Sequence, residues 1–491
     1  MIRDSHTFDY TMFSTKRTPD PLTSSAVAMR ASIDKPVAGS WWHSLLLFAL
    51  AFLLLNLPFW WLGRTNFLSR AWFNVDLLLP LAIASRSRIA AVGALALLWI
   101  MDAAVSQSLA WHFHSPFEFI RSIEFLPSVN LGGYLSLERL ALVVPFAACG
   151  AGAVALAGRV RRPGSAALVV LALVAVVDLS NGSNFLWERA MRLLPGNVGG
   201  SAVKQIVTAI SGTREDKIEP LAPGVALTSQ FDVESWARAH PDRDVLLVLV
   251  ESMGLHRDVA MRDWLRQQLF PVSLASRYTL REFDVPFHGS TTSAELRELC
   301  GLTGSYRKVL DAAPSGCLPQ HLIKNGWQTV GVHGFSRRMF VRGIWWPALG
   351  LRHVLFGEEL THPDQRFCGG AFVGVCDDEL IDRAFDQLKT PGRFVYALTL
   401  SSHLPLGSGT PPAPLEAICR QAQAGDGPCE LDATIGVALG AIGRDLAAVQ
   451  GKAPLVLVVG DHAPPFSILA WRNEFDQRVV PGFALEPKDP D

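Results

Sequence analysis

Three short stretches in the second half of the chain carry residue types that could do chemistry together. They read Val250-Glu251-Ser252, Gly289-Ser290-Thr291-Thr292-Ser293-Ala294-Glu295 and Gly460-Asp461-His462, and each follows an apolar, strand-like run. Together they offer carboxylates, hydroxyls and an imidazole. A divalent metal held by such groups activates a neighbouring hydroxyl as a nucleophile, because it stabilises the alkoxide. The three stretches therefore predict phosphoryl or sulfuryl transfer.

The predicted metal ligands are Glu251, Asp461 and His462, and the nucleophile lies in the loop 289–293. Oxygen ligands with one nitrogen suit Zn or Mn, and the ligand types alone do not separate these metals. Thr291 begins a predicted helix, whose free N–H groups and partial positive charge favour a bound phosphate. A second interpretation is that Ser290 or Thr291 merely caps this helix. The two interpretations are compatible.

Four buried strands are predicted to position these residues. The runs 245–250, 328–332, 394–400 and 455–459 are short, nearly continuous and rich in β-branched residues. Such runs are typical of strands buried on both faces in α/β folds with a mainly parallel sheet. Ligands bind outside the carboxyl ends of such strands. The polar residues that the sequence places there are Glu251, His333, His403, Asp461 and His462.

The composition divides the chain into a membrane part and a water-soluble part. At 491 residues the chain is too long for one ordinary domain. It is 49% hydrophobic and only 18% charged, and the apolar excess lies in the first 180 residues. Lys and Arg number 44 against 45 Asp and Glu, and no basic face or tail stands out. A nucleic-acid partner is therefore not expected.

The apolar part is predicted to cross the membrane about five times. Apolar runs long enough for a hydrocarbon core of ~30 Å, or close to it, cover 41–63, 72–85, 89–107, 137–158 and 166–179. Clusters of Lys and Arg precede the first run and follow the second and fourth, which places the residues after the fifth outside the cytoplasm. The weakest run is 72–85, and the alternative is a re-entrant or interfacial segment. Four spans would then put both ends of the membrane part on the same side.

These patterns predict four regions. Residues 1–40 are expected to be cytoplasmic and disordered, 41–180 to form the transmembrane domain, 181–240 a linker and 241–491 an extracytoplasmic domain. Six cysteines fall in the last region as the close pairs Cys300 with Cys317, Cys368 with Cys376, and Cys419 with Cys429. Such pairs suggest disulfides in an oxidising compartment, and the alternative is a set of unpaired buried thiols. Glu118 and Glu124, in the outer loop after the third span, are expected to be ordinary exposed residues, and the alternative is contact with a cationic head group.

At this point the chain resembles a known family. It is similar to the membrane-anchored, sulfatase-like branch of the alkaline phosphatase superfamily, which contains lipoteichoic acid synthases (phosphoglycerol transferases) and lipid A phosphoethanolamine transferases. The resemblance covers the order of about five helical spans, a linker and an α/β domain with a mainly parallel central sheet. The Gly-x-Thr loop of the phosphoglycerol transferases matches Gly289-Ser290-Thr291, with Glu295 four residues past the Thr. This match selects Thr291 as the nucleophile, with Thr292 as the fallback.

The resemblance also assigns roles to the other residues. It implies metal ligation by Glu251, Thr291, Asp461 and His462. Its head-group-binding segment matches His333, Phe340 and Arg342, with Phe where the family usually has Trp. Its Ser-His-x-Pro segment matches 402–405, so that His403 would protonate a leaving oxygen or bind phosphate. The cysteine pairs look more like the phosphoethanolamine transferases, whereas the Gly-Asp-His and Gly-x-Thr motifs look more like the phosphoglycerol transferases.

The function implied by the resemblance is a metal-dependent phosphotransferase of a bacterial inner membrane with its catalytic domain in the periplasm. Thr291 would take phosphoethanolamine or phosphoglycerol from phosphatidylethanolamine or phosphatidylglycerol, and a phosphothreonine intermediate would pass it to a glycan or glycolipid hydroxyl. The cofactor would be at least one divalent metal, Zn or Mn.

Three alternatives remain open at the level of sequence. In a phosphodiesterase or phosphatase, water would accept the group from the same intermediate. A sulfatase would carry a formylglycine in a Cys-x-Pro-x-Arg motif, and the nearest match, Cys317-Leu318-Pro319-Gln320-His321, has His in place of Arg. A non-catalytic membrane protein would keep the fold as a binding module, although every ligand position is filled.

Overall fold

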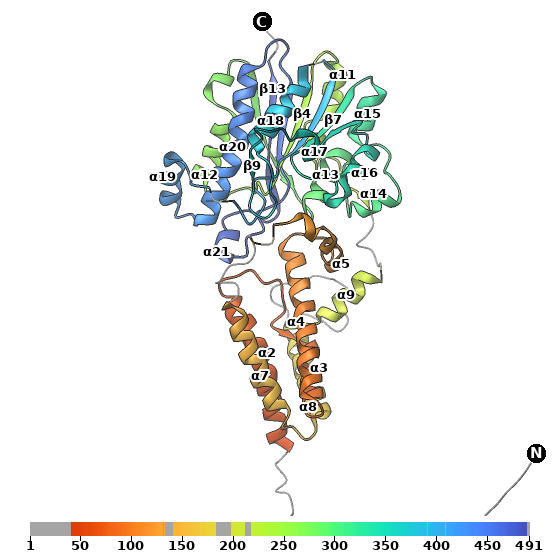
Figure 1. Ribbon diagram of the computed structural model, residues 1–491, viewed down its shortest axis with the longest axis vertical. Helices are drawn as coiled ribbons and strands as arrows, with labels where there is room; N and C mark the ends of the chain where they lie inside the picture. The colour runs from red at the N-terminus through yellow and green to blue at the C-terminus, as the bar shows by residue number, and fades with distance from the viewer. Residues whose placement is uncertain are drawn as a thin grey trace, which may run out of the picture.

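The protein is described here from a computed structural model, which defines residues 41–130, 132, 141–182, 198–211, 218–389, 391–407 and 409–488. The predicted cytoplasmic region 1–40 lies outside these residues. Figure 1 shows a bundle of helices at one end of the long axis and an α/β domain at the other.

The helical bundle contains α2 (Trp41–Leu62), α3 (Leu78–Ala84), α4 (Arg88–Ala110), α7 (Val143–Ala157) and α8 (Pro163–Ser180). Within the described residues, three helices are long and apolar enough to cross a membrane, namely α2, α4 and α8. The other two predicted spans correspond to the shorter apolar segments Val75–Ala84 and Val143–Ala157. The structure thus confirms three membrane-length helices, and the five-span topology stays a prediction.

A buried ion pair fixes the chain between α2 and α3. Arg70 Nε lies 2.7 Å from Asp102 Oδ2 on α4, and Arg70 also donates to Asn56 Oδ1 on α2 at 3.0 Å. All three side chains are buried. Partnered polar groups of this kind hold helices together inside an apolar bundle. These contacts therefore tie the C-terminal half of α2 to α4.

The α/β domain is built on a seven-stranded sheet. Its strand order is β5 (Tyr278–Pro286), β13 (Val479–Pro487), β12 (Leu455–Gly460), β4 (Val245–Val250), β11 (Arg393–Leu398), β7 (Gln328–His333) and β8 (His353–Leu355). From β12 to β8 every neighbouring pair is parallel, whereas β13 pairs antiparallel with both β12 and β5. The sheet is therefore mostly parallel, and the four strands predicted from sequence lie side by side at its centre.

Helices cover both faces of the sheet, because side chains on a strand point alternately to its two sides. Leu246, Val248 and Val250 of β4 face the core beneath α12 (Val259–Leu269), α18 (Asp377–Asp386) and α20 (Asp426–Ala448). Val245, Leu247 and Leu249 face the other core. That core is covered by α10 (Leu227–Gln230), α11 (Val233–Ala239), α13 (Thr291–Cys300), α15 (Leu318–Lys324) and α16 (Arg342–Ala348). Residues 227–239, which the sequence places in the linker, are thus part of the α/β core.

The remaining elements are short connections. They are β1 (Phe73–Asn74), η1 (Val75–Leu77), α5 (Pro116–Arg121), η2 (Ser122–Ser128), β2 (Gly199–Gly200), α9 (Ala202–Ile210), β3 (Glu219–Pro220), η4 (Val272–Leu274), β6 (Leu302–Thr303), α14 (Arg307–Asp311), η5 (Met339–Val341), α17 (Gly357–Leu360), β9 (Phe367–Cys368), β10 (Gly374–Val375), η6 (Gln387–Lys389), α19 (Ala413–Ala422) and α21 (Leu469–Arg472). In Figure 1, α5, α9 and α21 lie near the junction between the bundle and the α/β domain.

Three disulfides join the cysteine pairs named from sequence. Cys300 bonds to Cys317, Cys368 to Cys376, and Cys419 to Cys429. The first connects the end of α13 to the residue before α15. These bonds agree with the prediction of an oxidising compartment, since disulfides persist there.

Asp432 is a buried carboxyl group whose neutralisation we expect to stabilise the protein. It is 1% exposed on α20, and neither carboxylate oxygen has a hydrogen-bond partner among the described residues. Burial raises its pKa to about 7, above the ordinary value near ~4 in an unfolded chain. The folded state therefore binds the proton more tightly. Keeping the Asp432 carboxylate charged in the folded state therefore lowers the free energy of unfolding. This loss is absent below about pH 4, grows up to about pH 7 and is fully present above it.

We expect Asp432→Asn to raise the free energy of unfolding at pH 8 by on the order of 4 kcal/mol. Thermal melts between pH 4 and pH 8 should show a gain that increases with pH. The matched control is Asp311→Asn, an exposed position, for which little change is expected at any pH. A gain that is the same at pH 4 and pH 8 would contradict this account of Asp432.

Candidate active site

The predicted metal ligands meet at the carboxyl edge of the sheet. Glu251 follows β4, and Asp461 and His462 follow β12, whose last residue Gly460 is paired in register with Val250. One ligand atom from each of the three side chains lies within 4.8 Å of the others. Ser252 has a positive φ of 55°, an uncommon backbone conformation for a residue with a side chain. This turn directs the Ser252 N–H to Asp461 Oδ1 at 2.8 Å.

Backbone hydrogen bonds occupy Asp461 Oδ1 and His462 Nδ1, and the other side-chain ligand atom of each residue faces the cluster. Asp461 Oδ1 accepts from the backbone N–H groups of Ser252 and His462, whereas Oδ2 makes no hydrogen bond within the described residues. His462 Nδ1 donates to the carbonyl of Ala463 at 3.1 Å, so Nε2 keeps its lone pair. Nε2 lies 3.3 Å from Asp461 Oδ2. A buried carboxylate oxygen without a donor, facing an imidazole nitrogen, fits a divalent cation.

The electrostatics of these three groups also fit a cation. Burial raises the pKa of Glu251, and the neighbouring Asp461 raises it further. Burial also raises the pKa of Asp461, to about 6, and lowers that of His462. Two buried carboxylates repel each other, and a neutral imidazole beside them cannot compensate. A bound divalent cation would remove this repulsion.

Thr291 lies against this cluster as the first residue of α13. Its hydroxyl donates to Glu251 Oε2 at 3.1 Å and lies 3.5 Å from His462 Nε2. Ser290 is the N-cap, and its side chain makes no capping hydrogen bond. Thr291 therefore points its hydroxyl into the predicted metal site, and capping does not account for its position. Thr292, the fallback nucleophile, has its hydroxyl 3.3 Å from that of Ser290 instead.

Two residues fix the start of α13 relative to the ligands. Arg297 donates to the carbonyls of Gly460 at 2.8 Å and of Asp461 at 3.2 Å, which ties the helix to the end of β12. Gly289 has a φ of +88°, and a Cβ there would lie 2.5 Å from Ser293 Oγ and 2.6 Å from His114 Nε2. Glycine is required for this turn. Sequence reasoning did not single out Arg297, because its partners are backbone carbonyls of a distant segment.

Glu295 holds Arg342 in the same pocket. Arg342 donates to Glu295 Oε1 through Nε at 3.0 Å and through its terminal nitrogen at 2.7 Å, and Trp346 donates to the other carboxylate oxygen at 2.6 Å. Glu295 is 0% and Arg342 3% exposed. Phe340 stacks over the guanidinium, with 5.2 Å between the Arg342 carbon and the ring centre. Arg342 is thus a fixed cation in the same pocket as Thr291, the predicted nucleophile.

Two histidines present lone pairs to the pocket. His333 donates through Nδ1 to the carbonyl of Leu398 at 3.0 Å, and its buried Nε2 has no hydrogen-bond partner among the described residues. Burial lowers the pKa of His333 to about 3, and nearby Arg342 contributes. His403 donates through Nδ1 to the carbonyl of Leu404 at 2.8 Å, and burial also lowers its pKa. Both imidazoles are therefore neutral acceptors at Nε2.

The structure brings the predicted site residues into one pocket. Glu251, Thr291, His333, Phe340, Arg342, His403 and His462 all line it. Asp461 lies directly beneath and is 0% exposed. The pocket walls are largely aromatic, with Trp111, Phe113, Phe335 and Phe372 between the polar groups. The arrangement combines a candidate cation site, a hydroxyl, a fixed guanidinium and two neutral imidazoles.

A segment from the helical bundle completes this pocket, and sequence reasoning missed it. Trp111, directly after α4, stacks on His403 with ring centres 5.5 Å apart. His112 donates to the carbonyl of Ala463, the same carbonyl that accepts from His462. His114 Nε2 lies 2.6 Å from Ser293 Oγ on α13. The only sequence signal is four residues, Trp-His-Phe-His, directly after a span.

The expectation that Glu118 is an ordinary exposed residue is wrong. Glu118 is 5% exposed and accepts from Ser305 Oγ at 2.9 Å. Glu124 is half exposed and forms an ion pair with Arg307. Both glutamates therefore dock the segment after α4 onto the α/β domain, through partners that lie more than a hundred residues away.

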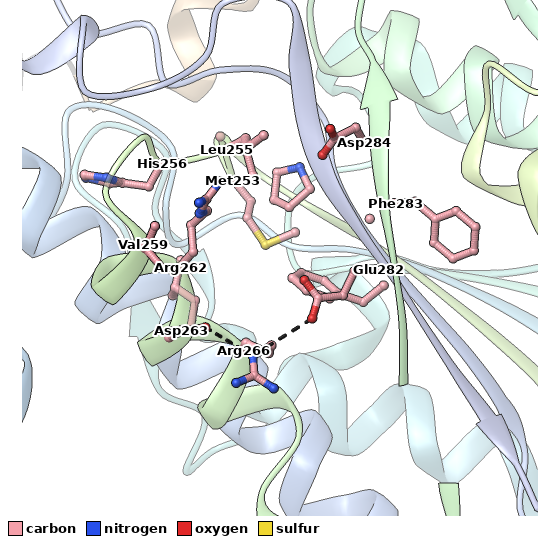
Figure 2. A pocket seen from close by; sticks show the side chains of 15 residues that line it. Met253, Leu255, His256, Val259, Arg262, Asp263, Arg266, Glu282, Phe283 and Asp284 are labelled. Atoms are coloured by element: carbon pink, nitrogen blue, oxygen red, sulfur yellow. Dashed lines mark hydrogen bonds and ion pairs between the residues drawn. The ribbon is translucent and has the colours of Figure 1, made fainter. Parts of the chain in front are cut away.

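A second hollow lies near the site but holds none of the predicted site residues. Three of its charged side chains pair with one another, since Arg266 lies 3.4 Å from Asp263 and 4.0 Å from Glu282. Figure 2 shows Arg266 between these two carboxylates, with Met253 and His256 above α12. Exposed pairs of this kind are solvated and need no ligand. We therefore place the candidate chemistry at Thr291.

Metal binding should be measurable as stabilisation of the folded protein. Adding Mn²⁺ or Zn²⁺ at about a hundred times its dissociation constant is expected to raise the free energy of unfolding by about 2.7 kcal/mol. Asp461→Asn should lose this gain, because it removes Oδ2, the buried carboxylate oxygen that accepts no hydrogen bond within the described residues. Asp263→Asn, in the hollow of Figure 2, should keep it. Equal stabilisation of all three proteins would show that the metal binds elsewhere.

Neither a protein-family model nor a curated protein sequence matches the chain. Several solved structures are similar to it. Lipoteichoic acid synthase LtaP from Listeria monocytogenes matches with a TM-score of 0.38 and 15% identity over 52% of this chain and 67% of that chain. The phosphoglycerol transferase GacH from Streptococcus pyogenes, in complex with sn-glycerol-1-phosphate, has a TM-score of 0.34 and 15% identity over 54% and 77%.

The C-terminal periplasmic domain of EptC from Escherichia coli, in complex with Zn, matches with a TM-score of 0.32 and 11% identity over 51% of this chain and 74% of that chain.

Proposed function

We propose that the protein is a membrane-anchored, metal-dependent phosphotransferase. It moves phosphoethanolamine or phosphoglycerol from a phospholipid to a hydroxyl of a glycan or glycolipid, through a phosphothreonine on Thr291. The observation that carries this proposal is the Thr291 hydroxyl, which lies 3.1 Å from Glu251 and 3.5 Å from His462 at the start of a helix. The inner membrane of a bacterium is the proposed location, with the α/β domain in the periplasm.

Glu251, Asp461 and His462 would hold the metal, with Thr291 completing the set. When bound, a Zn²⁺ or Mn²⁺ ion supplies Lewis-acid stabilisation of a deprotonated hydroxyl and of phosphate charge. The chain contributes the geometry. The turn at Gly289 and the hydrogen bonds of Arg297 to the carbonyls of Gly460 and Asp461 fix the position of Thr291. The first turn of α13 presents backbone N–H groups to a phosphate.

Arg342 and His333 would bind the transferred group. The guanidinium is fixed by Glu295 and offers its remaining N–H groups to a phosphate oxygen. His333 is neutral, so its Nε2 accepts a hydrogen bond from a hydroxyl or ammonium of the head group. Phe340 packs on the guanidinium and narrows the pocket.

His403 would exchange a proton with the oxygen that leaves or attacks. Its Nδ1 proton is held by the carbonyl of Leu404, so the free Nε2 is suited to accept a proton from the acceptor hydroxyl. The same lone pair would serve water if water were the acceptor. The phosphodiesterase therefore remains the second candidate, and the released product separates the two.

The disulfide of Cys317 argues against the sulfatase alternative. Formylglycine forms from a free cysteine, whereas Cys317 is bonded to Cys300 and is 0% exposed. Cys317 also does not line the pocket that contains Thr291.

The proposed function is tested by incubating the purified protein and Mn²⁺ or Zn²⁺ with fluorescent phosphatidylethanolamine or phosphatidylglycerol in mixed micelles. Release of diacylglycerol from one lipid, with transfer of its head group to an added glycolipid, supports a transferase. Release of free phosphoethanolamine or glycerol phosphate in the presence of the acceptor supports the phosphodiesterase. Intact lipid in every reaction would refute both.

A further inference from the structure

The segment between α4 and α5 reaches from the helical bundle into the α/β domain. It reads Trp-His-Phe-His-Ser at 111–115 and directly follows the membrane-length helix α4. In Figure 1, α5 and the C-terminal end of α4 lie on the side of the bundle that faces the α/β domain. Trp111 and Phe113 line the pocket that contains Thr291, whereas His112 and His114 do not. Any effect of these two histidines on the chemistry must therefore pass through the residues that they contact.

His114 contacts the loop 289–293 at both of its ends. Its Nε2 lies 2.6 Å from Ser293 Oγ, in the first turn of α13. At the other end of the loop, a Cβ on Gly289 would lie 2.6 Å from the same nitrogen, so the imidazole packs directly against the Gly289 backbone. Thr291, the proposed nucleophile, lies midway between these two contacts in sequence. The imidazole of His114 therefore spans the turn that carries Thr291.

The direction of the hydrogen bonds makes His114 the donor to Ser293. The Ser293 hydroxyl donates to the carbonyl of Gly304 at 3.4 Å. A serine hydroxyl carries one proton and two lone pairs, so it accepts the Nε2 proton of His114. Ser293 is 2% exposed, and the loss of a partner is costly for a buried polar group. His114 therefore supplies the shorter of the two hydrogen bonds that hold the Ser293 hydroxyl.

Glu118 holds His114 against the same part of the α/β domain. Its Oε2 accepts from the backbone N–H of His114 at 3.3 Å, and its Oε1 accepts from Ser305 Oγ at 2.9 Å. Ser305 directly follows Gly304, whose carbonyl accepts from Ser293. The side chain and the backbone of His114 are thus linked to neighbouring residues of the α/β domain. Support of this kind keeps a functional side chain in one geometry.

The loop that carries Thr291 has little support of its own. Gly289 has no side chain and a φ of +88°, and glycine gives the backbone more conformational freedom than other residues do. Ser290, the N-cap of α13, makes no side-chain capping hydrogen bond. Arg297 ties α13 to the end of β12, but it does so further along the helix. Keeping the Thr291 hydroxyl 3.1 Å from Glu251 Oε2 therefore requires a contact at the loop itself.

We propose that His114 is a positioning residue for the transfer reaction: through the Ser293 hydroxyl it holds the loop 289–293, and thereby directs Thr291 toward the metal ligands. The inference rests on the proposed function and adds to it a residue that belongs to the bundle rather than to the α/β domain. His114 does not line the pocket, so it takes no part in the bonds that form and break. Its effect is on rate, since a displacement of ~1 Å at a reacting group can cost ~10²-fold.

His114→Phe tests this role by kinetics, because it keeps a ring beside Gly289 and removes the N–H that Ser293 accepts. It is expected to lower kcat by roughly 10–100-fold, both for the lipid donor and for the soluble diester bis(p-nitrophenyl) phosphate. KM and the metal-dependent gain in melting temperature should stay close to wild type. His114→Gln restores an N–H donor near the position of Nε2 and should recover most of kcat.

The matched control is His321→Phe. His321 also contacts a polar side chain, with its Nδ1 3.0 Å from Glu234 Oε2, but it lies outside the pocket. This variant should leave kcat within about twofold of wild type for both substrates. A wild-type kcat in His114→Phe, or an equally low kcat in His114→Gln, would overturn the proposal.

Hydrogen–deuterium exchange tests the same hydrogen bond without turnover. The backbone amides of 289–296 should exchange faster in His114→Phe than in wild type, while those of β4 and β12 stay unchanged. Ser293→Ala removes the acceptor and leaves His114 in place, so it should produce the same local change and serves if His114→Phe does not fold. Faster exchange confined to 289–296 supports the role of His114 even if wild type transfers nothing, a result that would refute the proposed function alone. Unchanged exchange in either folded variant, or faster exchange throughout the domain, refutes the inference even if transfer is observed.

Discussion

Replacing Thr291 by alanine is expected to reduce transfer from the lipid donor by roughly 10⁴-fold or more, as removal of a nucleophile does in other covalent enzymes. The substitution deletes the hydroxyl that lies 3.1 Å from Glu251 Oε2 and leaves Glu251, Asp461 and His462 in place. Metal binding should therefore weaken only modestly. The rate of diacylglycerol release and the metal-dependent gain in melting temperature, measured on the same preparation, separate loss of chemistry from loss of the site.

Two matched variants sharpen the test of Thr291. Thr291→Ser keeps a hydroxyl at the same place and should retain measurable transfer. Thr292→Ala removes the neighbouring hydroxyl, which lies against Ser290 and not against the metal ligands, and should stay near the wild-type rate. Transfer that survives in Thr291→Ala but not in Thr292→Ala would assign the nucleophile to Thr292.

Breaking the Glu295–Arg342 pair should have the second large effect, on stability as well as on activity. Glu295→Ala leaves the Arg342 guanidinium, which is 3% exposed, and the Trp346 indole N–H without their carboxylate partner. Removing one partner of a buried ion pair costs about 3–5 kcal/mol, because the remaining charge stays buried and unpaired. A loss of this size should be visible as a lower melting temperature, and transfer should fall as Arg342 loses its fixed position.

The double variant Glu295→Leu with Arg342→Met separates the two effects. Apolar replacement of both partners removes the unpaired charge, so most of the lost stability should return. Transfer should not return, because the cation that binds the phosphate is gone. Recovery of both stability and transfer in the double variant would show that the pair is purely structural and would remove Arg342 from the proposed substrate site.

Much of the sheet could be predicted from local sequence. The runs around β4, β7, β11 and β12 are almost continuously apolar because these strands are buried on both faces. A continuous apolar run is a local pattern, so it can be recognised from neighbouring residues in the sequence. The site residues follow these strands directly, so that alignment of the parallel strand ends brings Glu251, Asp461 and His333 to one edge. The three disulfides could also be predicted from the spacing of the cysteines, because each joins two residues that are close in sequence.

Features that depend on contacts between distant segments could not be predicted. His114 contacts Ser293 across 179 residues, and Glu118 contacts Ser305 across 187. No periodicity links such positions, so Glu118 was wrongly expected to be exposed. Span length is a related case. Val75–Ala84 and Val143–Ala157 are apolar but short, and hydropathy alone does not decide whether such helices cross the membrane.

The most direct test of the central claim is the intact mass of the purified protein after incubation with Mn²⁺ or Zn²⁺ and either phosphatidylethanolamine or phosphatidylglycerol. A covalent phosphoethanolamine or phosphoglycerol on Thr291, located by peptide mapping and absent from Thr291→Ala, is the predicted result. It would establish the phosphothreonine and name the transferred group. An unmodified Thr291 under conditions in which the lipid is turned over would contradict the account.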